Sequence, residues 1–342
     1  MKKLFTLAFA LVFSTGIAVA QNNDATIDTD GDRNSASITQ QSNANLSEAS
    51  ITQTGDANTG DLTQQNGFYH EATLEQVGDR NSATLTQDNT NTFADLYQEG
   101  NGNTIVGFQR SRLFGGPGVS ISDLEVDQIG SGNYVDVDMD AESPTGEPKT
   151  NVADIDQDGD RNTVLLSQNR SDFSSNSGNG LNSASISQVG NGNYTDAAQD
   201  GRGQALEQSV MGDRNDLFST QEGRFQYLNL EVAGNGNSMV SDQIGGGNRA
   251  FVDLLGDRNT FTLDQSSTGN QVGATITGSG NTIDVLQSGS SNRVTGASGA
   301  FTQQGIVVDG NQNMVDVDQL SSGNTATVSV MGNGNSAVVD QQ

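Results

Sequence analysis

Hydrophobic and polar residues alternate along short segments of this chain, and the segments return about every eleven residues. In the stretch QVGDRNSATLTQ, which runs from Gln76 to Gln87, a period-two pattern places Asn81, Ala83 and Leu85 on one side together with Gln87. A period of two is typical of a β-strand with one buried face. The glycine near the start of each unit supplies the backbone freedom that a tight turn needs. Each unit is therefore predicted to form about seven residues of strand and about four residues of turn.

The repeat stays in frame over long distances. Asparagines follow one another at steps of eleven residues from Asn237 to Asn292, and the same step separates Asn313, Asn324 and Asn335. A single unit cannot bury its apolar face, whereas stacked units bury it between them. The chain is therefore predicted to form one all-β domain over residues 21–342, an amyloid-like β-solenoid of strand–turn–strand rungs. Two units make a rung of about 22 residues, and about a dozen rungs at the usual strand spacing would span roughly 60 Å.

The inward positions of the predicted strands alternate between amides and apolar residues. A buried amide is costly when it lacks a partner, but in a stack each amide bonds to the same amide above and below it. The positions predicted to form these inward amide ladders are Asn34, Gln40, Gln53, Asn58, Gln76, Asn81, Gln87, Asn162, Gln168, Asn193, Asn237, Asn248, Asn259, Asn281, Gln319, Asn324, Asn335 and Gln341. The positions predicted to form a narrow apolar core are Ala36, Ile38, Ala83, Leu85, Val164, Leu166, Ala184, Ile186, Ala326 and Val328.

The frame is interrupted in a few places. Insertions are predicted near residues 110–121, 140–150 and 169–181, and all the prolines of the chain fall within the first two. Proline removes a hydrogen bond from a central strand, so these segments are expected to be surface excursions. Elsewhere an apolar residue replaces glutamine and is expected to face inward without continuing the ladder, as at Val232, Leu254, Ile276 and Val330.

Residues 1–20 have the pattern of a secretory signal peptide. Lys2 and Lys3 precede an apolar run over residues 4–13, and an A-x-A cleavage site predicts a cut between Ala20 and Gln21. No later stretch approaches the roughly 18 apolar residues that a membrane-spanning helix needs. The chain is therefore predicted to be secreted and to act outside the cell.

Composition narrows the chemistry. The chain has no cysteine, and its apolar content of 32% suits a thin repetitive structure better than a large core. The net charge is −27; without residues 1–20, 13 basic and 42 acidic residues remain, which gives −29. Such a chain repels nucleic acid, so no nucleic-acid partner is expected.

The repeat resembles that of the curlin family, the subunits of curli fibres, which is similar to Q-x-G-x-x-N-x-A-x-x-x-Q. The pattern occurs at Gln76–Gln87, and at Gln53–Gln64 with Gly60 in the alanine position. The resemblance covers nearly all of residues 23–342. It implies a β-solenoid that stacks end to end into extracellular amyloid, for adhesion and biofilm matrix. It also implies that inward polar residues of the terminal repeats promote assembly, here Gln40, Gln53, Asn58, Gln319, Asn324, Asn335 and Gln341.

The implied partners are further copies of the same chain, other curlin-type subunits and an outer-membrane secretion apparatus. Curlins carry a secretion segment before the first repeat. In this chain Asn23, Ala25 and Ile27 are already in the repeat frame, so almost no such segment separates the repeats from the signal peptide.

The sequence carries no pattern of an enzyme or of a cofactor site. His70 is the single histidine and stands in an asparagine position, so neither a catalytic triad nor a zinc cluster is expected. Acidic pairs such as Asp154/Asp156 are expected on the outer face, where they would limit aggregation. Loose binding of divalent cations by such stacked carboxylates is a further expectation.

The pattern favours a structural protein that self-assembles into curli-like fibres, and leaves two alternatives. One is a monomeric secreted adhesin that binds a surface or a polysaccharide through its insertions. The other is an ice-binding solenoid, for which pairs such as Thr84/Thr86 and Thr260/Thr262 are suggestive, but aspartates interrupt the threonine array.

Overall fold

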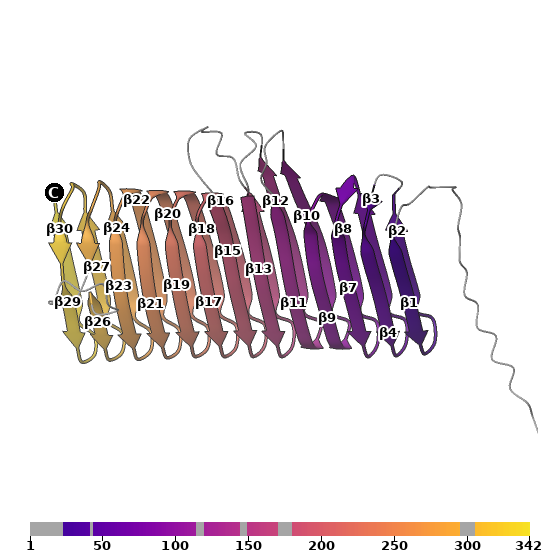
Figure 1. Ribbon diagram of the computed structural model, residues 1–342. Coiled ribbons are helices and arrows are strands. Elements are labelled where there is room, and N and C mark those ends of the chain that lie inside the picture. The colour runs from indigo at the N-terminus through magenta and orange to yellow at the C-terminus, as the bar shows by residue number, and fades with distance from the viewer. Residues whose placement is uncertain (1–22, 42–43, 114–119, 144–148, 170–179, 295–304) are drawn as a thin grey trace, which may run out of the picture.

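The computed structural model describes residues 23–41, 44–113, 120–143, 149–169, 180–294 and 305–342. In these residues the regular structure consists of β-strands, and every strand pair is parallel. Two long sheets face each other along the molecule, as Figure 1 shows from the first strand in indigo to the last in yellow. The prediction of an all-β solenoid is confirmed.

The first sheet, called sheet A here, contains 15 strands. They are β1 (Asp24–Asp30), β4 (Glu48–Thr54), β7 (His70–Val77), β9 (Thr92–Asn101), β11 (Ile121–Ser131), β13 (Lys149–Asp158), β15 (Gly180–Val189), β17 (Ala205–Met211), β19 (Tyr227–Ala233), β21 (Arg249–Leu255), β23 (Gln271–Thr277), β25 (Arg293–Val294), β26 (Ile306–Asp309), β28 (Thr325–Ala326) and β29 (Val328–Met331).

The second sheet, sheet B, contains 13 strands. They are β2 (Ser35–Gln40), β5 (Thr59–Gln65), β8 (Ser82–Asn89), β10 (Thr104–Leu113), β12 (Tyr134–Ser143), β14 (Thr163–Asn169), β16 (Tyr194–Arg202), β18 (Asp216–Arg224), β20 (Ser238–Gly246), β22 (Thr260–Thr268), β24 (Thr282–Gln287), β27 (Met314–Gln319) and β30 (Ser336–Gln341). A separate pair, β3 (Ala44–Asn45) and β6 (Gly67–Phe68), lies beside the first rungs.

One strand of sheet A and the following strand of sheet B make a rung, and the described residues form 13 rungs, one for each strand of sheet B. Rung 1 contains β1 and β2, and rung 13 contains β28, β29 and β30. The chain pairs each rung with the next in a strict register; β20 and β22, for example, pair Ser238 with Thr260, 22 residues on. Residues that are equivalent in the repeat therefore lie directly beside one another along the whole stack.

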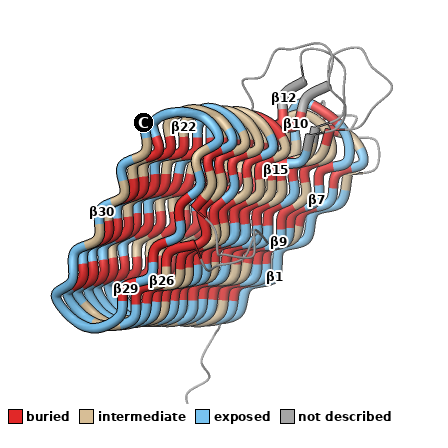
Figure 2. Tube along the Cα trace, turned by 90° about the vertical axis from the view of Figure 1, so that its left-hand side faces the viewer, coloured by how far each residue is buried: buried red, intermediate tan, exposed pale blue. Residues whose placement is uncertain are grey.

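The core is the narrow space between the two sheets. Figure 2 shows buried residues in continuous stripes along the inner faces, with exposed residues on the outside and at the turns. The stripes follow the alternation of the sequence, since inward positions hold small or branched apolar residues and amides. Because each rung is only two strands wide, no inward side chain lies far from the solvent-facing turns, which suits the modest apolar content of the chain.

The turn from sheet A to sheet B depends on a column of glycines. Gly100 has a φ of +111°, and a Cβ at this position would lie far inside contact distance of the carbonyl oxygen of Gly130 in the next rung. The same overlap recurs at Gly78, whose Cβ would meet the carbonyl oxygen of Gly100. A glycine is needed here for both the positive φ and the close approach of successive turns.

The insertions differ from the prediction in two ways. Two of them begin later than predicted, and a further insertion is present. β10 and β12 continue to Leu113 and Ser143, so residues assigned to the insertions near 110–121 and 140–150 are paired strand. Val294 of β25 and Ile306 of β26 both pair with strand β23. Val294 lies 22 residues after its partner, and Ile306 lies 32 residues after its own. An unpredicted insertion therefore begins after Val294. Pro117, Pro144 and Pro148 lie outside the described residues.

The glycine column generates a first prediction. Gly100→Ala should lower the free energy of unfolding by roughly 2–4 kcal/mol, since alanine disfavours the positive φ and its Cβ overlaps the next turn. Gly102 is the matched control: its φ is +70°, nothing lies within 4 Å of its Cβ position, and Ala57 adopts a φ of +60° at the equivalent position. Gly102→Ala should cost less, about 1 kcal/mol, because only the left-handed φ disfavours alanine there. Denaturant titration of both variants checks this, and equal losses would contradict it.

Candidate functional site: amide columns and open sheet edges

Glutamines form hydrogen-bonded columns inside both sheets. In sheet A, Nε2 of Gln53 donates to Oε1 of Gln76 at 2.8 Å, and the series continues through Gln98, Gln128, Gln157 and Gln188. In sheet B, one series runs from Gln40 to Gln109 and a second from Gln168 to Gln341. In every pair, the amide nitrogen of one rung donates to the amide oxygen of the following rung, so all the columns point the same way.

The columns end where an apolar residue takes the glutamine position. The four replacements named from the sequence are buried in sheet A: Val232, Leu254, Ile276 and Val330. Three further replacements were not recognised from the sequence. Val210 and Val308 stand in the same position of sheet A. Met139 separates the two series of sheet B and is fully buried. Because methionine donates no hydrogen bond, the buried Oε1 of Gln168 has no partner in the next-lower rung or elsewhere among the described residues.

Asparagines form a different kind of column at the start of each sheet B strand. The backbone N–H of Asn58 donates to Oδ1 of Asn34 at 2.9 Å, while Nδ2 of Asn58 donates to the carbonyl oxygen of Gly78 at 2.7 Å. The same pair of bonds joins Asn313 to Asn281 and to Gly332. The expectation of amide-to-amide bonds above and below each asparagine is thus incomplete. The side chain mainly bonds the backbone of the adjacent rungs and closes the turn that follows the glycine.

The equivalent position in sheet A is less regular, and His70 occupies it in rung 3. His70 is 1% exposed, and its Nδ1 lies 2.6 Å from Oγ1 of Thr92 in rung 4. Burial lowers the pKa of His70 to about 4, so the imidazole is neutral at neutral pH. The residue thus replaces an asparagine in the column, as its place in the repeat suggested.

The other inward positions named from the sequence lie as follows. Between the ends of the stack, the amides of the predicted ladders are at most 1% exposed: Gln53, Asn58, Gln76, Asn81, Gln87, Asn162, Gln168, Asn193, Asn237, Asn248, Asn259, Asn281 and Gln319. The core residues that are at most 6% exposed are Ala83, Leu85, Val164, Leu166, Ala184, Ile186, Ala326 and Val328. The positions that remain half-buried at the two ends are Asn34, Ala36, Ile38, Gln40, Asn324 and Gln341, and Asn335 is exposed. Ala20 and Gln21 lie outside the described residues.

A further column runs along the turns and was not recognised from the sequence. The residue after each turn glycine uses its side-chain oxygen to accept the backbone N–H of the equivalent residue one rung earlier. Asp32 N–H donates to Oδ1 of Asp56 at 2.8 Å, and Asn311 N–H donates to Oδ1 of Asn333 at 2.7 Å. The signal in the sequence is a recurring Asp, Asn or Ser after the glycine, which ordinary turns also favour.

The sheet edges are the open surfaces of this arrangement. β1 and β2 form one edge of the two sheets, and β28, β29 and β30 form the other. At the rung 13 edge, Gln341 Nε2 bonds only back to the carbonyl of Thr325 in its own rung. At the rung 1 edge, Gln40 donates its Nε2 to Gln64, and its Oε1 lies on the side away from the other described rungs. In the glutamine column the rung 13 edge therefore offers a donor and the rung 1 edge an acceptor, and in the asparagine column these roles are exchanged.

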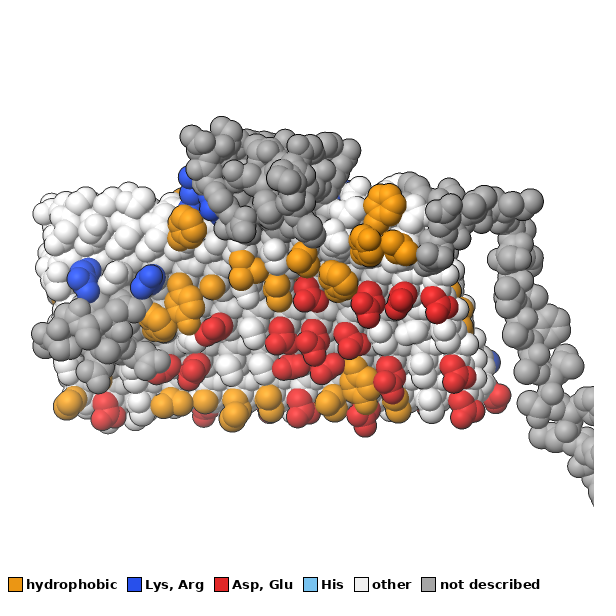
Figure 3. All heavy atoms as spheres, viewed as in Figure 1, with side chains coloured by type: hydrophobic (Ala, Val, Ile, Leu, Met, Phe, Trp, Pro, Cys, Tyr) orange, Lys and Arg blue, Asp and Glu red, His pale blue; other side chains and the backbone are white. Residues whose placement is uncertain are grey.

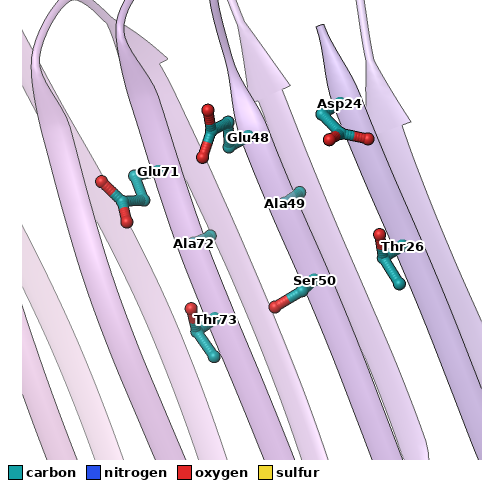
Figure 4. A pocket seen from close by; sticks show the side chains of 8 residues that line it. All are labelled: Asp24, Thr26, Glu48, Ala49, Ser50, Glu71, Ala72 and Thr73. Atoms are coloured by element: carbon teal, nitrogen blue, oxygen red, sulfur yellow. The ribbon is translucent and has the colours of Figure 1, made fainter.

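Other chemistry is sparse among the described residues. No group of three or more His, Cys, Asp or Glu side chains in them is arranged to hold a metal ion, so loose divalent binding stays a prediction. None of the described elements is a helix long and apolar enough to cross a membrane. The hollows of the surface are shallow; the one over β1, β4 and β7, of about 130 Å³, is lined by a row of carboxylates and a row of hydroxyls (Figure 4).

The gap in the sheet B column generates a second prediction. Met139→Gln should raise the free energy of unfolding by about 1 kcal/mol, because the new amide can accept from Gln109 and donate to the unpartnered Oε1 of Gln168. Loss of apolar burial at residue 139 offsets part of the gain. Met139→Leu is the control of similar volume and should give no gain. Chemical denaturation checks both; a Met139→Gln protein less stable than Met139→Leu would show that the gap costs little.

Comparison with known proteins agrees with this architecture. A sequence model of the curlin-associated repeat matches residues 20–55, 45–78, 55–88 and 256–289, which lie in the first three rungs and in rungs 10 and 11. A search of curated proteins finds no match to this chain. Proteins of the curlin repeat family are structural rather than enzymatic. The chain therefore carries repeats of the curlin repeat family, in its first three rungs and again in rungs 10 and 11.

Proposed function

We propose that this chain is a secreted structural protein that polymerises end to end into extracellular fibres for adhesion and biofilm matrix. The observation that carries the proposal is the complementarity of its two sheet edges. Each hydrogen-bonded column keeps one direction along the stack: glutamine amides donate toward rung 13, and asparagine N–H groups donate toward rung 1. The last rung of one copy therefore matches the first rung of another. A contact between two different surfaces of identical molecules generates an open filament when, as in this register, it repeats the step from one rung to the next and does not close into a ring.

The columns continue across such a joint in register. Gln341 Nε2 of one copy would donate to Oε1 of Gln40 of the next, as Gln319 Nε2 donates to Gln341 Oε1 at 2.7 Å within the molecule. Asn34 N–H would donate to Oδ1 of Asn335, as Asn335 N–H donates to Asn313 Oδ1. The half-buried inward residues at the two edges would then become fully buried.

The apolar positions also match. Ala36 and Ile38 of rung 1, and Ala337 and Val339 of rung 13, are partly buried and pack against the core from its two ends. In the continued register Ala337 would lie beside Ala36, and Val339 beside Ile38. Removing these faces from water is favourable in proportion to the apolar area that is buried.

Charge favours this joint over other contacts between copies. Rung 1 carries Asp24 on its outer face, in a column with Glu48 and Glu71 that Figure 4 shows side by side. The sheet A strands of rung 13, β28 and β29, carry no charged residue. Asp24 would therefore lie beside Thr325, whereas within the molecule carboxylates one rung apart repel by about 0.9 kcal/mol in water.

The rest of the surface opposes association. Carboxylates gather in rows over the middle of the face shown in Figure 3, where sheet A carries Glu125, Asp127, Asp154 and Asp156. Burial raises the pKa of Glu125, and the charges of Asp154 and Asp127 raise it further. Such a face keeps copies apart sideways, so growth is directed to the two ends of the stack, where Asp24 meets the uncharged Thr325. Other curlin-type subunits could add at the same edges, and an outer-membrane apparatus is the proposed export route.

The first measurement is assembly itself. Residues 21–342, purified at neutral pH and moderate salt, should form unbranched fibres with a rising thioflavin signal, followed over days and imaged by negative-stain electron microscopy. Val339→Lys should block growth, because it places a charge on the inward face of the last rung. Val338→Lys is the matched control, since Val338 is 64% exposed on the outer face of the same strand. A lasting monodisperse monomer with β-type circular dichroism would contradict the proposal and favour a monomeric adhesin.

Fibre growth should also depend on salt and pH. Added salt screens the carboxylate rows, and acidification toward the sequence pI of about 4.1 protonates them. The pKa values of Glu125, Asp127 and Asp156 are raised in the folded chain, by burial first and by neighbouring carboxylates second. The folded chain therefore binds these protons more tightly than the unfolded chain, so its stability rises as the pH falls through the raised pKa values and is lost again as the pH rises. Equal elongation rates at low and high salt would sink this prediction.

A further inference from the structure

We propose that Arg33 and Gly334 form a lock that selects the correct joint between two copies, in which Arg33 of one copy seats on Gly334 of the other. The inference rests on the proposed end-to-end assembly and names the residues that set its direction and register. The inference follows from the column of residues at one position of the turn between sheet A and sheet B. This position comes directly after the Asp, Asn or Ser whose side chain accepts a hydrogen bond from the rung before it.

In this column a rung with a long side chain is never followed by a second rung with a long side chain. From rung 1 to rung 13 the residues are Arg33, Ala57, Arg80, Gly102, Gly132, Arg161, Gly192, Arg214, Gly236, Arg258, Gly280, Gln312 and Gly334. All of them have a positive φ, from 56° at Arg214 to 70° at Gly102, so long and short residues share one backbone conformation. The turn itself therefore accepts either size, and the alternation must come from contact between rungs.

That contact is visible at the glycines. A Cβ at Gly192 would lie 3.8 Å from Cγ of Arg214 in the next rung, and a Cβ at Gly280 would lie 3.7 Å from Cγ of Gln312. The same contact recurs at Gly132 and Gly236, so in these four pairs the stem of the long side chain crosses the glycine of the rung before it. Two arginines in successive rungs would compete for this space and repel each other.

Gly334 is the seat that the molecule leaves open. Nothing lies within 4 Å of its Cβ position, and it belongs to the edge formed by rung 13. In the continued register the next residue of the column is Arg33 of a second copy, so the long–short pattern runs on across the joint. The hydrogen bonds of the turn continue as well. Asn333 N–H would donate to Oδ1 of Asp32, as Asn311 N–H donates to Asn333 within the molecule.

The lock rejects the reversed joint. Two rung 1 edges placed face to face with these turns opposed would bring Arg33 against Arg33 and Asp32 against Asp32, and each contact is between like charges. Two rung 13 edges would leave both glycine seats empty. Within the correct joint, Asp32 meets the uncharged Asn333, so neither residue of the turn faces its own charge.

Disulfide trapping tests the geometry directly, because the chain contains no cysteine. Residues one rung apart are about 4.8 Å apart, within the range that a disulfide can span. The double variant Arg33→Cys with Gly334→Cys, assembled into fibres and mildly oxidised, should give a ladder of covalent oligomers on a non-reducing gel. Each single variant should also form fibres but should run as a monomer on the same gel, because it forms no cross-link. Dimers from Arg33→Cys alone would demonstrate the reversed joint, and fibres of the double variant without cross-links would place the joint elsewhere; either result overturns the inference.

Seeded growth tests the energetic role. With wild-type seeds, Gly334→Arg should slow elongation about fivefold at low salt, from the repulsion of two unit charges one rung apart, and less at high salt. Adding Arg33→Gly to this variant should restore growth when seeds and monomers both carry the two changes. Both variants keep Gln312 beside the new arginine, so the difference between their elongation rates reports on the joint alone. Circular dichroism checks that each variant is folded. Unchanged growth of Gly334→Arg overturns the lock but not assembly, whereas a wild-type chain that forms no fibres overturns both.

Discussion

The rest of the structure depends on one constraint, the strict register that places each residue beside its own equivalent one rung away. Gln243 lies beside Gln265, and Leu263 beside Val285, at the spacing of paired strands. A position in the repeat can therefore hold only a residue that tolerates a near copy of itself at about 4.8 Å. Glutamine satisfies this condition as both donor and acceptor, small apolar residues satisfy it by packing, and glycine satisfies it where successive turns touch. The unusual composition of the chain follows from this condition rather than from any catalytic need.

Carboxylates do not tolerate their own copies, and the chain treats them differently from place to place. On sheet B, Arg110 lies between Asp88 and Asp140 of the adjacent rungs, with nitrogen–oxygen distances of 3.3 and 3.4 Å. In the turns, Asp213 and Asp257 are separated by the uncharged Asn235. In the middle of sheet A the carboxylates stay adjacent, and their pKa values are raised by burial first and by the neighbouring charges second. Because the repulsion acts between rungs that are already held by buried columns, it weakens the folded stack only slightly. It is fully felt by a second molecule that approaches from the side.

The period of eleven residues was sufficient to predict the solenoid, the rung length and which side chains face inward, because period and register are the same property in a stack. The features that the period could not predict depend on contacts that the eleven-residue pattern does not encode. The donors of Asn58 reach a glycine carbonyl of the next rung rather than another amide, and this requires the three-dimensional path of the turn. Met139 reads as one apolar residue among many until the register places it between two glutamines. The insertion after Val294 was hidden because the frame resumes after it with the next asparagine. The size alternation from Arg33 to Gly334 has a period of two rungs, so a search for eleven-residue units averages it away.

The joint between copies should nevertheless be weaker than any boundary inside the molecule. In sheet B the glutamine and asparagine columns would cross it intact. In sheet A the glutamine position holds Thr29 in rung 1 and Val330 in rung 13, so no amide bond can bridge that side. An interior boundary is also spared the loss of translational and rotational freedom that each association step must overcome, roughly 4–15 kcal/mol. A joint that repeats most of an interior boundary but carries this additional cost would form reversibly at its first step. It would hold once several molecules were aligned, and a stressed fibre would part between molecules before any one of them unfolded.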